Sequence, residues 1–540
     1  MVSISERNEF VLIFFLLGSL IIIFNFPDIF LSKTMYVDDH HRYILGLKNQ
    51  IHESIFKRNT VRAYVIFPLY KLLSINLMYA RLAQTICFYL PLAFSFYLLL
   101  RLYTTLPLSV VFCSSLLPCI LPGQTQIPSF IDGSYTVQGL LSFTIMLLAS
   151  FKFLSLQKFY LWRYILSVFI YAISLEMMDH SVFLLPIAII SYFFVVPFQQ
   201  NWKKIAALSI GQGVLALLKT LQMLYSPTVS ASVPVKPSWD MFVDRLSSLI
   251  TATLPFSYSI FGKPINSFVL LLIFSLIILI GSYKAKRNDR ILICLGLGWA
   301  FCSSITFLTV SRFYSSRYAH IPGFGINFSF VMSLWVIFQN LKIRFNKNIF
   351  FILLICIVIF SGSSRILHLS KIFTPQNNTH DVITSTLSKY NFPENSQIII
   401  INGGRIPTGG WWNYSSGYFK YATRRKDVTG LIGPEKGFYN PYDSKKRGFS
   451  PDHQMSGLTL ENPAFYFRLD CKQGCELYQK EYSLQWESDS WKVYKFNLQT
   501  GNIEKVYKGS DIEEFNEFLR KNKLTQNDIV FAKGMPSYLN

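Results

Sequence analysis

Apolar positions gather into long runs separated by short polar connections along the first two thirds of the chain. A helix needs about 20 consecutive apolar residues to cross a hydrocarbon core of roughly 30 Å. Eleven runs approach this length: residues 9–31, 80–100, 105–122, 135–151, 160–177, 182–198, 204–222, 265–282, 290–310, 324–340 and 349–366. The pattern predicts a polytopic α-helical membrane protein with about 11 transmembrane helices.

The polar connections predict which way the helices cross. Three of them are basic: NWKK at 201–204, GSYKAKRNDR at 281–290 and NLKIRFNKN at 340–348. The positive-inside rule assigns such connections to the cytoplasm. Alternation from these anchors puts the N-terminus in the cytoplasm and the C-terminal region on the outer side. The first apolar run lacks a small-residue cleavage site and is predicted to be a retained helix.

The first outer connection, residues 32–79, is long and patterned. Four apolar residues recur in it at helical spacing and predict a helix lying along the membrane surface: Ile44, Leu47, Ile51 and Ile55. The following segment AYVIFPLYKLLSI is apolar but too short to span, and it predicts a second surface segment.

Apolar density falls sharply after residue 367. The runs QIIIING, AFYFRL and WKVYKF alternate with glycine-rich turns and predict strands, while SDIEEFNEFLRKN predicts a helix. We therefore expect two domains, a membrane domain at 1–370 and an extracytoplasmic α+β domain at 371–540.

Composition excludes a water-soluble globule, since 51% of the 540 residues are hydrophobic and only 15% are charged. The net charge of +21 does not predict a nucleic-acid partner, because basic residues in a membrane chain first set topology and contact anionic lipid. Six of the eight cysteines lie in the apolar spans. Cys471 and Cys475 lie in the tail, where a local disulfide is expected; a metal site there lacks a second ligand pair.

Two adjacent carboxylates, Asp38 and Asp39, follow the first span in MYVDDHHRY. Their side chains diverge on a helix or a strand, so one can act while the other orients. A carboxylate at the mouth of a bundle suits accepting a proton from a hydroxyl or holding a divalent cation. The alternative is an ion pair of Asp38 with Arg42 that begins the surface helix.

Further acids lie at predicted outer ends of spans, namely Asp132 in IPSFIDGSY and the group of Glu176, Asp179 and His180 in EMMDH. Acids at membrane depth are costly and usually face a cavity. The structural alternatives are an Asp-Gly turn for Asp132 and a plain helix terminus for the EMMDH group.

The outer loop SRFYSSRYAHIPG carries four residues that suit an anion: Arg312, Arg317, Tyr318 and His320. Closely spaced arginines fit multidentate phosphate binding, and basic residues on the outer side oppose the positive-inside tendency. A lipid headgroup and a bound lipid-phosphate substrate both satisfy this pattern. Lys219 and Arg245 are further candidates for such a pocket, although a snorkelling lysine needs no function.

Together these features resemble the GT-C class of integral membrane glycosyltransferases, which use polyprenyl-phosphate sugars. The class implies an acidic pair after the first helix, surface helices before the second, later outer acids and a basic lipid-phosphate site. SRYAHIPG is similar to the arginine-tyrosine-x-x-proline pattern of protein mannosyltransferase-like and lipid A aminoarabinose transferase-like members. More narrowly, YVDDHHRYILG followed by KRNTVRAY resembles phage-type serotype-converting O-antigen glucosyltransferases, departing at Thr60 to Ala63 where that group tends to show Gly-Arg-Pro.

The resemblance implies inverting transfer of a hexose, expected to be glucose, from a polyprenyl-phosphate donor to a lipid-linked O-antigen or other surface glycan. The reaction would take place on the periplasmic face of a bacterial inner membrane. Asp38 or Asp39 is expected to be the general base, and Arg312, Arg317, Tyr318 and His320 are expected to hold the donor phosphate. The expected accessory or acceptor residues are Arg42, Arg62, Asp132, Glu176, Asp179 and His180. No cofactor is required, and a divalent metal is compatible with the acids.

The rival interpretation is a lipid handler of another kind, an O-antigen polymerase or ligase, or a flippase for lipid-linked glycans. A flippase is expected to carry charges at mid-bilayer in a two-fold repeat. The predicted charges gather at one face instead, and the sequence shows no repeat.

Overall fold

The computed structural model describes residues 4–33, 43, 45–47, 49, 60–124, 131, 134–195, 198–225, 239–259, 263–309, 316–341, 347–389, 397–401, 420–426, 429–432, 468–470, 476–479, 482–485, 491–497 and 502–509.

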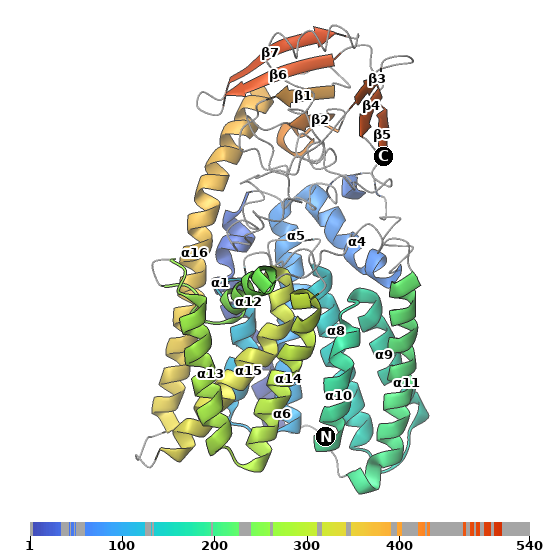
Figure 1. The fold of residues 1–540 in the computed structure, drawn as a ribbon, viewed down its shortest axis with the longest axis vertical. Helices are drawn as coiled ribbons and strands as arrows, with labels where there is room; N and C mark the ends of the chain where they lie inside the picture. The colour runs from blue at the N-terminus through green and yellow to red at the C-terminus, as the bar shows by residue number, and fades with distance from the viewer. Residues whose placement is uncertain are drawn as a thin grey trace.

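All eleven predicted spans are helical, and the helices stand side by side in one bundle (Figure 1). In chain order they are α1 (Ile4–Phe24) continued by η1 (Pro27–Leu31), α5 (Leu77–Gln84) with η2 (Thr85–Tyr89) and α6 (Leu90–Tyr103), α7 (Leu108–Leu116) with η3 (Leu117–Cys119), α8 (Ser134–Leu154), α9 (Leu161–Met177), α10 (Ser181–Val195), α11 (Phe198–Tyr225), α13 (Ser267–Lys284), α14 (Arg287–Thr309), α15 (Ser316–Asn340) and α16 (Lys347–Lys389). Among the described residues, seven helices are long and apolar enough to cross a membrane, and two shorter helices are also apolar. The chain is a multi-pass α-helical membrane protein.

The basic connections lie together at the end of the bundle far from the strands (Figure 1). The α10 to α11, α13 to α14 and α15 to α16 connections all turn at this end. This arrangement is the one that the charge pattern predicts. Which compartment each end faces stays a prediction.

Two helices lie across the opposite end of the bundle, α4 (Thr60–Ile75) and α12 (Trp239–Thr253), as Figure 1 shows. Asn76 caps the helix after α4, because its side-chain oxygen accepts from the backbone of Met78 at 2.8 Å. A small core seats α4 on this end of the bundle: Tyr43, Ile66, Leu69, Tyr70, Leu73, Leu77, Ala80 and Ile131.

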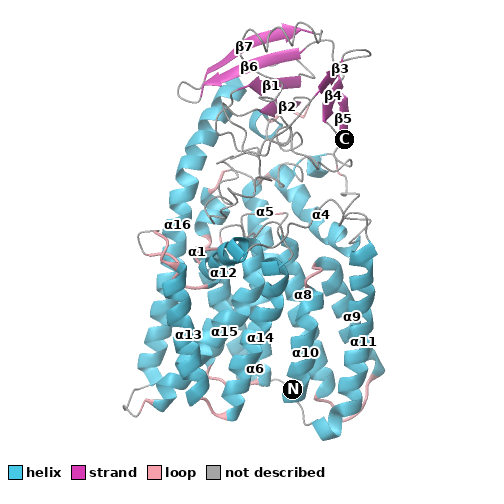
Figure 2. Cartoon of the chain, in the orientation of Figure 1, coloured by secondary structure: helices cyan, strands magenta, loops and turns pink. Residues whose placement is uncertain are grey.

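α16 runs from the end of the bundle that carries the basic connections to the strands, and the strands that the structure describes lie beyond the opposite end (Figures 1 and 2). One sheet has the order β2 (Thr429–Ile432), β1 (Gln397–Ile401), β6 (Trp491–Asn497) and β7 (Asn502–Gly509). β1 pairs in parallel with β2 and β6, and β6 pairs antiparallel with β7. An antiparallel sheet holds β3 (Arg468–Asp470), β4 (Glu476–Gln479) and β5 (Tyr482–Gln485).

Two of the predicted strands coincide with β1 and β6, and the third overlaps β3. The predicted helix at 510–522 and the cysteines Cys471 and Cys475 lie outside the described residues. The division into domains at residue 370 stays a prediction.

α1 and α16 approach each other closely at Gly362. A Cβ added there would overlap the ring of Phe24, which is itself only 8% exposed. The absence of a side chain at 362 therefore lets the first and last spans pack together.

We expect Gly362→Ala to lower the free energy of unfolding by about 1–3 kcal/mol, because the Phe24 ring must move out of a packed position. Thermal unfolding of the detergent-solubilised protein measures this. Gly213→Ala in α11 is the matched control, since a Cβ there meets no atom within 4 Å and alanine favours a helix. Equal stability of the two variants would contradict the close approach.

Candidate functional site

A fully buried ion pair joins the first and last spans. Nη2 of Arg365 in α16 lies 2.5 Å from Oδ2 of Asp28 in η1, and both side chains are 0% exposed. Two charges removed from water at this depth are tolerated only when they are paired and hydrogen-bonded. The pair therefore fixes the end of the first span against α16.

Arg365 also binds the chain that follows η3. Its Nη1 donates to the carbonyls of Leu121 at 2.6 Å and Gln124 at 2.5 Å. The guanidinium carries several donors in a fixed fork and can bind more than one carbonyl at once. Ser361 of α16 donates to the carbonyl of Ile120 at 3.3 Å. The start of the connection from α7 to α8 is thus held by α16.

Gln124 carries the network on to α15. Its Oε1 lies 3.0 Å from Nδ1 of His320, and both residues are buried. The His320 ring stacks beside Tyr89, with ring centroids 5.1 Å apart, and Tyr89 donates to the carbonyl of Cys119 at 3.2 Å. Asp28 and Tyr89 both lie in π-helical turns, and such turns are frequent at functional sites.

We call Asp28, Gln124, His320 and Arg365 the polar junction. Three loops that carry predicted site residues begin or end at it. Lys33 lies five residues after Asp28, Gln124 precedes the connection with Asp132, and Arg317 lies less than one helical turn before His320. One buried network thus sets the roots of all three loops.

The far ends of two of these loops also meet. Tyr43, the neighbour of Arg42, and Ile131, the neighbour of Asp132, lie in the same small core under α4. At the near end, the backbone of Lys33 donates to Asn377 of α16 at 2.9 Å, and Asn377 donates to the carbonyl of Leu31 at 2.6 Å. The segment with the two aspartates is therefore bracketed by anchored residues.

The predicted site residues divide into two groups. Five of them lie outside the described residues: Asp38, Asp39, Arg42, Asp132 and Arg312. Arg317 and Tyr318 lie in the first turn of α15. His320 is buried and contacts Gln124, Tyr89 and Phe324. Its role at a phosphate stays a prediction.

The EMMDH group lies where α9 ends and α10 begins, and it surrounds a buried cation. Nζ of Lys219 in α11 lies 3.3 Å from Oε1 of Glu176 and 3.4 Å from Oδ1 of Asp179. The Lys219 side chain is 4% exposed, whereas the carboxylates are 30% and 21% exposed. The two carboxylates therefore stay partly exposed to solvent while they pair with the buried lysine. Lys219, a candidate for the anion pocket from the sequence, here contacts carboxylates.

Two other predicted basic residues have defined contacts. Arg62 of α4 lies over the ring of Tyr135, with Cζ 3.6 Å from the centroid, so α4 contacts the first turn of α8 just after Asp132. Arg245 of α12 donates to the carbonyl of Leu308 at 3.1 Å. Both stabilise the end of the bundle at which the three loops begin.

Within the described part of the chain, no three His, Cys, Asp or Glu side chains come together in a way that can hold a metal ion. Because Asp38, Asp39 and Asp132 lie outside that part, metal binding stays a prediction.

Sequence reasoning missed Asp28, Gln124 and Arg365. The first predicted span contains Asp28, and Arg365 is the one charged residue of the last predicted span. A charged residue inside an apolar span is costly and marks a functional or structural partner. An acid in the first span and a base in the last one were the signal for this pair.

Comparison with solved structures found archaeal oligosaccharyltransferase AglB from Archaeoglobus fulgidus, in complex with an inhibitory peptide and a dolichol-phosphate. That match has a TM-score of 0.44 and 12% identity, and it covers 86% of this chain and 70% of that chain. An Archaeoglobus fulgidus oligosaccharyltransferase tethered to an acceptor peptide containing an NVT sequon matches with a TM-score of 0.43 and 10% identity, covering 96% of this chain and 81% of that chain. No family model and no curated protein matches the chain, so no family is assigned.

We expect Asp28→Asn and Arg365→Met each to lower the free energy of unfolding by about 3–5 kcal/mol, because each leaves one buried charge without its counterion. The double variant is expected to lose less than the sum of the two single losses. Asp381→Asn is the control, since it breaks an ion pair with Lys33 whose side chains are 52% and 53% exposed, and exposed pairs contribute about 1 kcal/mol or less. Strict additivity would show that the buried charges do not interact.

A pH-sensitive contact lies beside Lys33. His380 of α16 is buried against Tyr421, with ring centroids 5.6 Å apart. The pKa of His380 is lowered to about 4, chiefly by burial; the Asp381 charge raises it and the Lys33 charge lowers it by smaller amounts. The folded state therefore holds this ring neutral.

We expect stability to fall as the pH drops from about 6.5 toward 4, because the unfolded chain then takes up a proton at His380 that the folded chain does not. Unfolding midpoints of the wild type and His380→Gln, measured between pH 7.5 and 4.5, test this. The wild type is expected to lose more stability than the variant on acidification. Parallel pH profiles would be incompatible with a neutral His380 in the fold.

Proposed function

We propose that this protein is an inverting membrane glycosyltransferase of the GT-C type. It transfers a hexose, glucose in the narrower form of the proposal, from a polyprenyl-phosphate donor to a lipid-linked O-antigen or other surface glycan. The reaction takes place at the end of the bundle that carries the strands, on the periplasmic side of a bacterial inner membrane. The C-terminal strands lie beside this end and assist acceptor binding.

One observation carries the proposal, namely that the three loops with the candidate residues originate from the same polar junction. The acids of the first loop, the acid Asp132 and the arginines before α15 are far apart in the sequence. Arg365, Gln124 and His320 tie the roots of these loops together. Catalytic groups need supports that are themselves locked by packing and hydrogen bonds, and the junction is such a support.

The proposed chemistry is a single displacement at the anomeric carbon. The acceptor oxygen forms a bond to this carbon as the bond to the phosphate oxygen breaks, so that polyprenyl phosphate leaves. The acceptor proton passes to Asp38 or Asp39 as general base. Arg312 and Arg317 stabilise the charge that develops on the departing phosphate. The leaving group is already activated, so positioning and charge stabilisation supply most of the rate enhancement.

The proposed accessory residues have two further roles. Glu176 and Asp179 keep partly exposed carboxylates on either side of Lys219, which suits hydrogen bonding to sugar hydroxyls. Arg62 holds α4 against Tyr135 in the first turn of α8. Arg42 and His180 complete the acceptor side of the proposal.

Transfer of labelled hexose from polyprenyl phosphate by the purified protein tests the function. We expect Asp38→Asn or Asp39→Asn to lower the rate at least 100-fold, since general base catalysis contributes about 10²–10⁴-fold. Arg317→Gln is expected to raise KM for the donor and to lower kcat. Asp381→Asn is the control outside the site.

Full transfer activity in both aspartate variants would end the general base assignment. Movement of lipid-linked glycan across proteoliposomes without any hexose transfer by the wild type would favour a flippase instead. Joining of glycan chains without a hexosyl-phosphate donor would favour a polymerase or ligase.

A further inference from the structure

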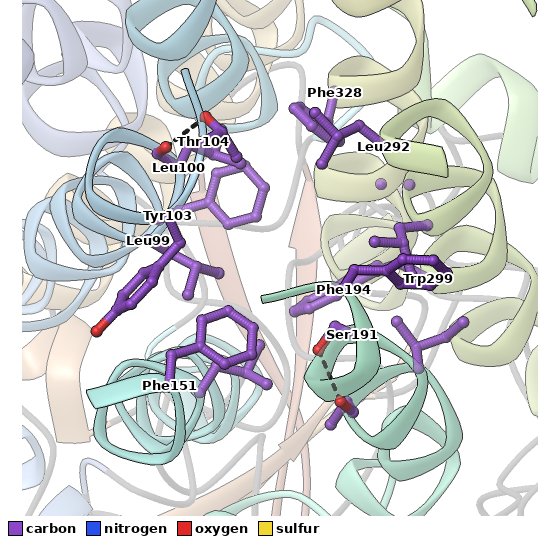
Figure 3. Close-up of a pocket in the computed structure, with 17 residues that line it drawn as sticks. Leu99, Leu100, Tyr103, Thr104, Phe151, Ser191, Phe194, Leu292, Trp299 and Phe328 are labelled. Atoms are coloured by element: carbon purple, nitrogen blue, oxygen red, sulfur yellow. Dashed lines mark hydrogen bonds between the residues drawn. The ribbon is translucent and has the colours of Figure 1, made fainter. Parts of the chain in front are cut away.

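An apolar cavity of about 140 Å³ lies inside the bundle near the end that carries the basic connections (Figure 3). α6, α8, α10, α14 and α15 supply its wall. Tyr103, Thr104, Phe151 and Phe194 lie in or directly after the last turn of their helices, whereas Leu292 lies in the second turn of α14. Phe96, Trp299 and Phe328 lie deeper in the bundle. The cavity therefore deepens from the basic end toward the middle of the bundle.

Several polar atoms of the wall already have partners, and the indole Nε1 of Trp299 donates to the carbonyl of Ile321 in α15 at 2.9 Å. The Thr104 hydroxyl donates to the carbonyl of Leu100 at 2.5 Å, and the Ser191 hydroxyl donates to that of Ala188 at 2.6 Å, as Figure 3 shows. A water needs two to four polar partners, and the wall consists mostly of apolar side chains. A hydrocarbon ligand meets the chemistry of the wall.

The volume sets the size of that ligand. An engineered apolar cavity of about 150 Å³ stays dry and binds benzene. A space of this size takes a short stretch of hydrocarbon chain. Phe194, which is 51% exposed, lies on the wall near the basic end, where a chain can enter from the membrane.

The charges around this end indicate the headgroup. Lys203 follows α10 within the first turns of α11, and Lys284, Lys286, Arg287 and Arg290 come shortly before Leu292. All five side chains are exposed. Basic residues near a membrane surface attract anionic lipid headgroups.

We infer that this cavity binds the end of one acyl chain of an anionic phospholipid. The headgroup lies among the five exposed basic residues at this end of the bundle, from Lys203 of α11 to Arg290 of α14. The site is at the opposite end of the bundle from the polar junction, and it does not depend on the proposed transfer reaction.

Photolabelling tests this site in the full-length purified protein. The probe is phosphatidylglycerol with a diazirine near the end of one acyl chain, and mass spectrometry maps the labelled peptides. We expect labels on residues 99–104 and 292–299. Phosphatidylcholine with the same acyl chain is expected to label them at least threefold less.

Two adjacent residues of α10 provide a matched pair of variants. Ser191→Phe fills the cavity and is expected to reduce its labelling at least fivefold. Ile190→Phe, at a residue that is 45% exposed, adds the same ring outside the cavity and is expected to leave the labelling unchanged. If Ser191→Phe fails to fold, Ala188→Leu fills the same space with a smaller group, and a monodisperse peak on size-exclusion chromatography establishes folding.

Equal labelling of the two α10 variants would overturn the cavity as the binding site. Equal labelling by the two phospholipids would overturn the role of the anionic headgroup. A diazirine-bearing polyprenyl phosphate that labels the cavity more strongly than phosphatidylglycerol would show that the cavity takes an isoprenoid chain, and would likewise overturn the inference.

Discussion

The positive charge of Arg365 inside the helix bundle is the constraint on which the arrangement of the end that carries the strands depends. A guanidinium without exposure to water has to find a counterion and acceptors within the protein. Asp28 supplies the counterion, and the carbonyls of Leu121 and Gln124 supply acceptors. The first span, the end of α7 and the last span therefore have to meet at one place. Removal of Asp28 or of Arg365 leaves the other charge buried without its counterion.

This constraint has a functional consequence because the loops continue directly from the residues that satisfy Arg365. The anchors are rigid, whereas the proposed chemical groups lie a few residues further along the chain. Sites of this kind are common, since a scaffold can hold loops that bind and react. The small core around Tyr43 and Ile131 adds a second anchor to two of the loops. The polar junction and this core together limit where Asp38, Asp39 and Asp132 can lie.

The apolar runs were enough to predict where helices lie, because each of the eleven runs overlaps a helical segment. Of the described helices, seven rather than about 11 are long and apolar enough to cross a membrane. The apolar runs could not predict the polar junction. Asp28 and Arg365 are 337 residues apart, and no local pattern states that two charges so distant will be neighbours. Gln124 and His320 join the network only through the tertiary packing of α15 against η3. The group around Lys219 was partly foreseen, since its acids were singled out, but the lysine that they hold comes from another helix.

α15 connects the polar junction with the apolar cavity. His320 at its beginning belongs to the polar junction, and Phe328, about two turns later, lines the cavity. Phe324 lies between them, with its ring centroid 5.2 Å from that of His320 and 5.0 Å from that of Phe96 in the cavity wall. Gly325 allows α15 to pack directly on Gly296 of α14. Spatial continuity is not by itself energetic coupling. It does mean that a displacement of α15 changes the cavity and the root of the arginine loop together, because one helix forms part of both.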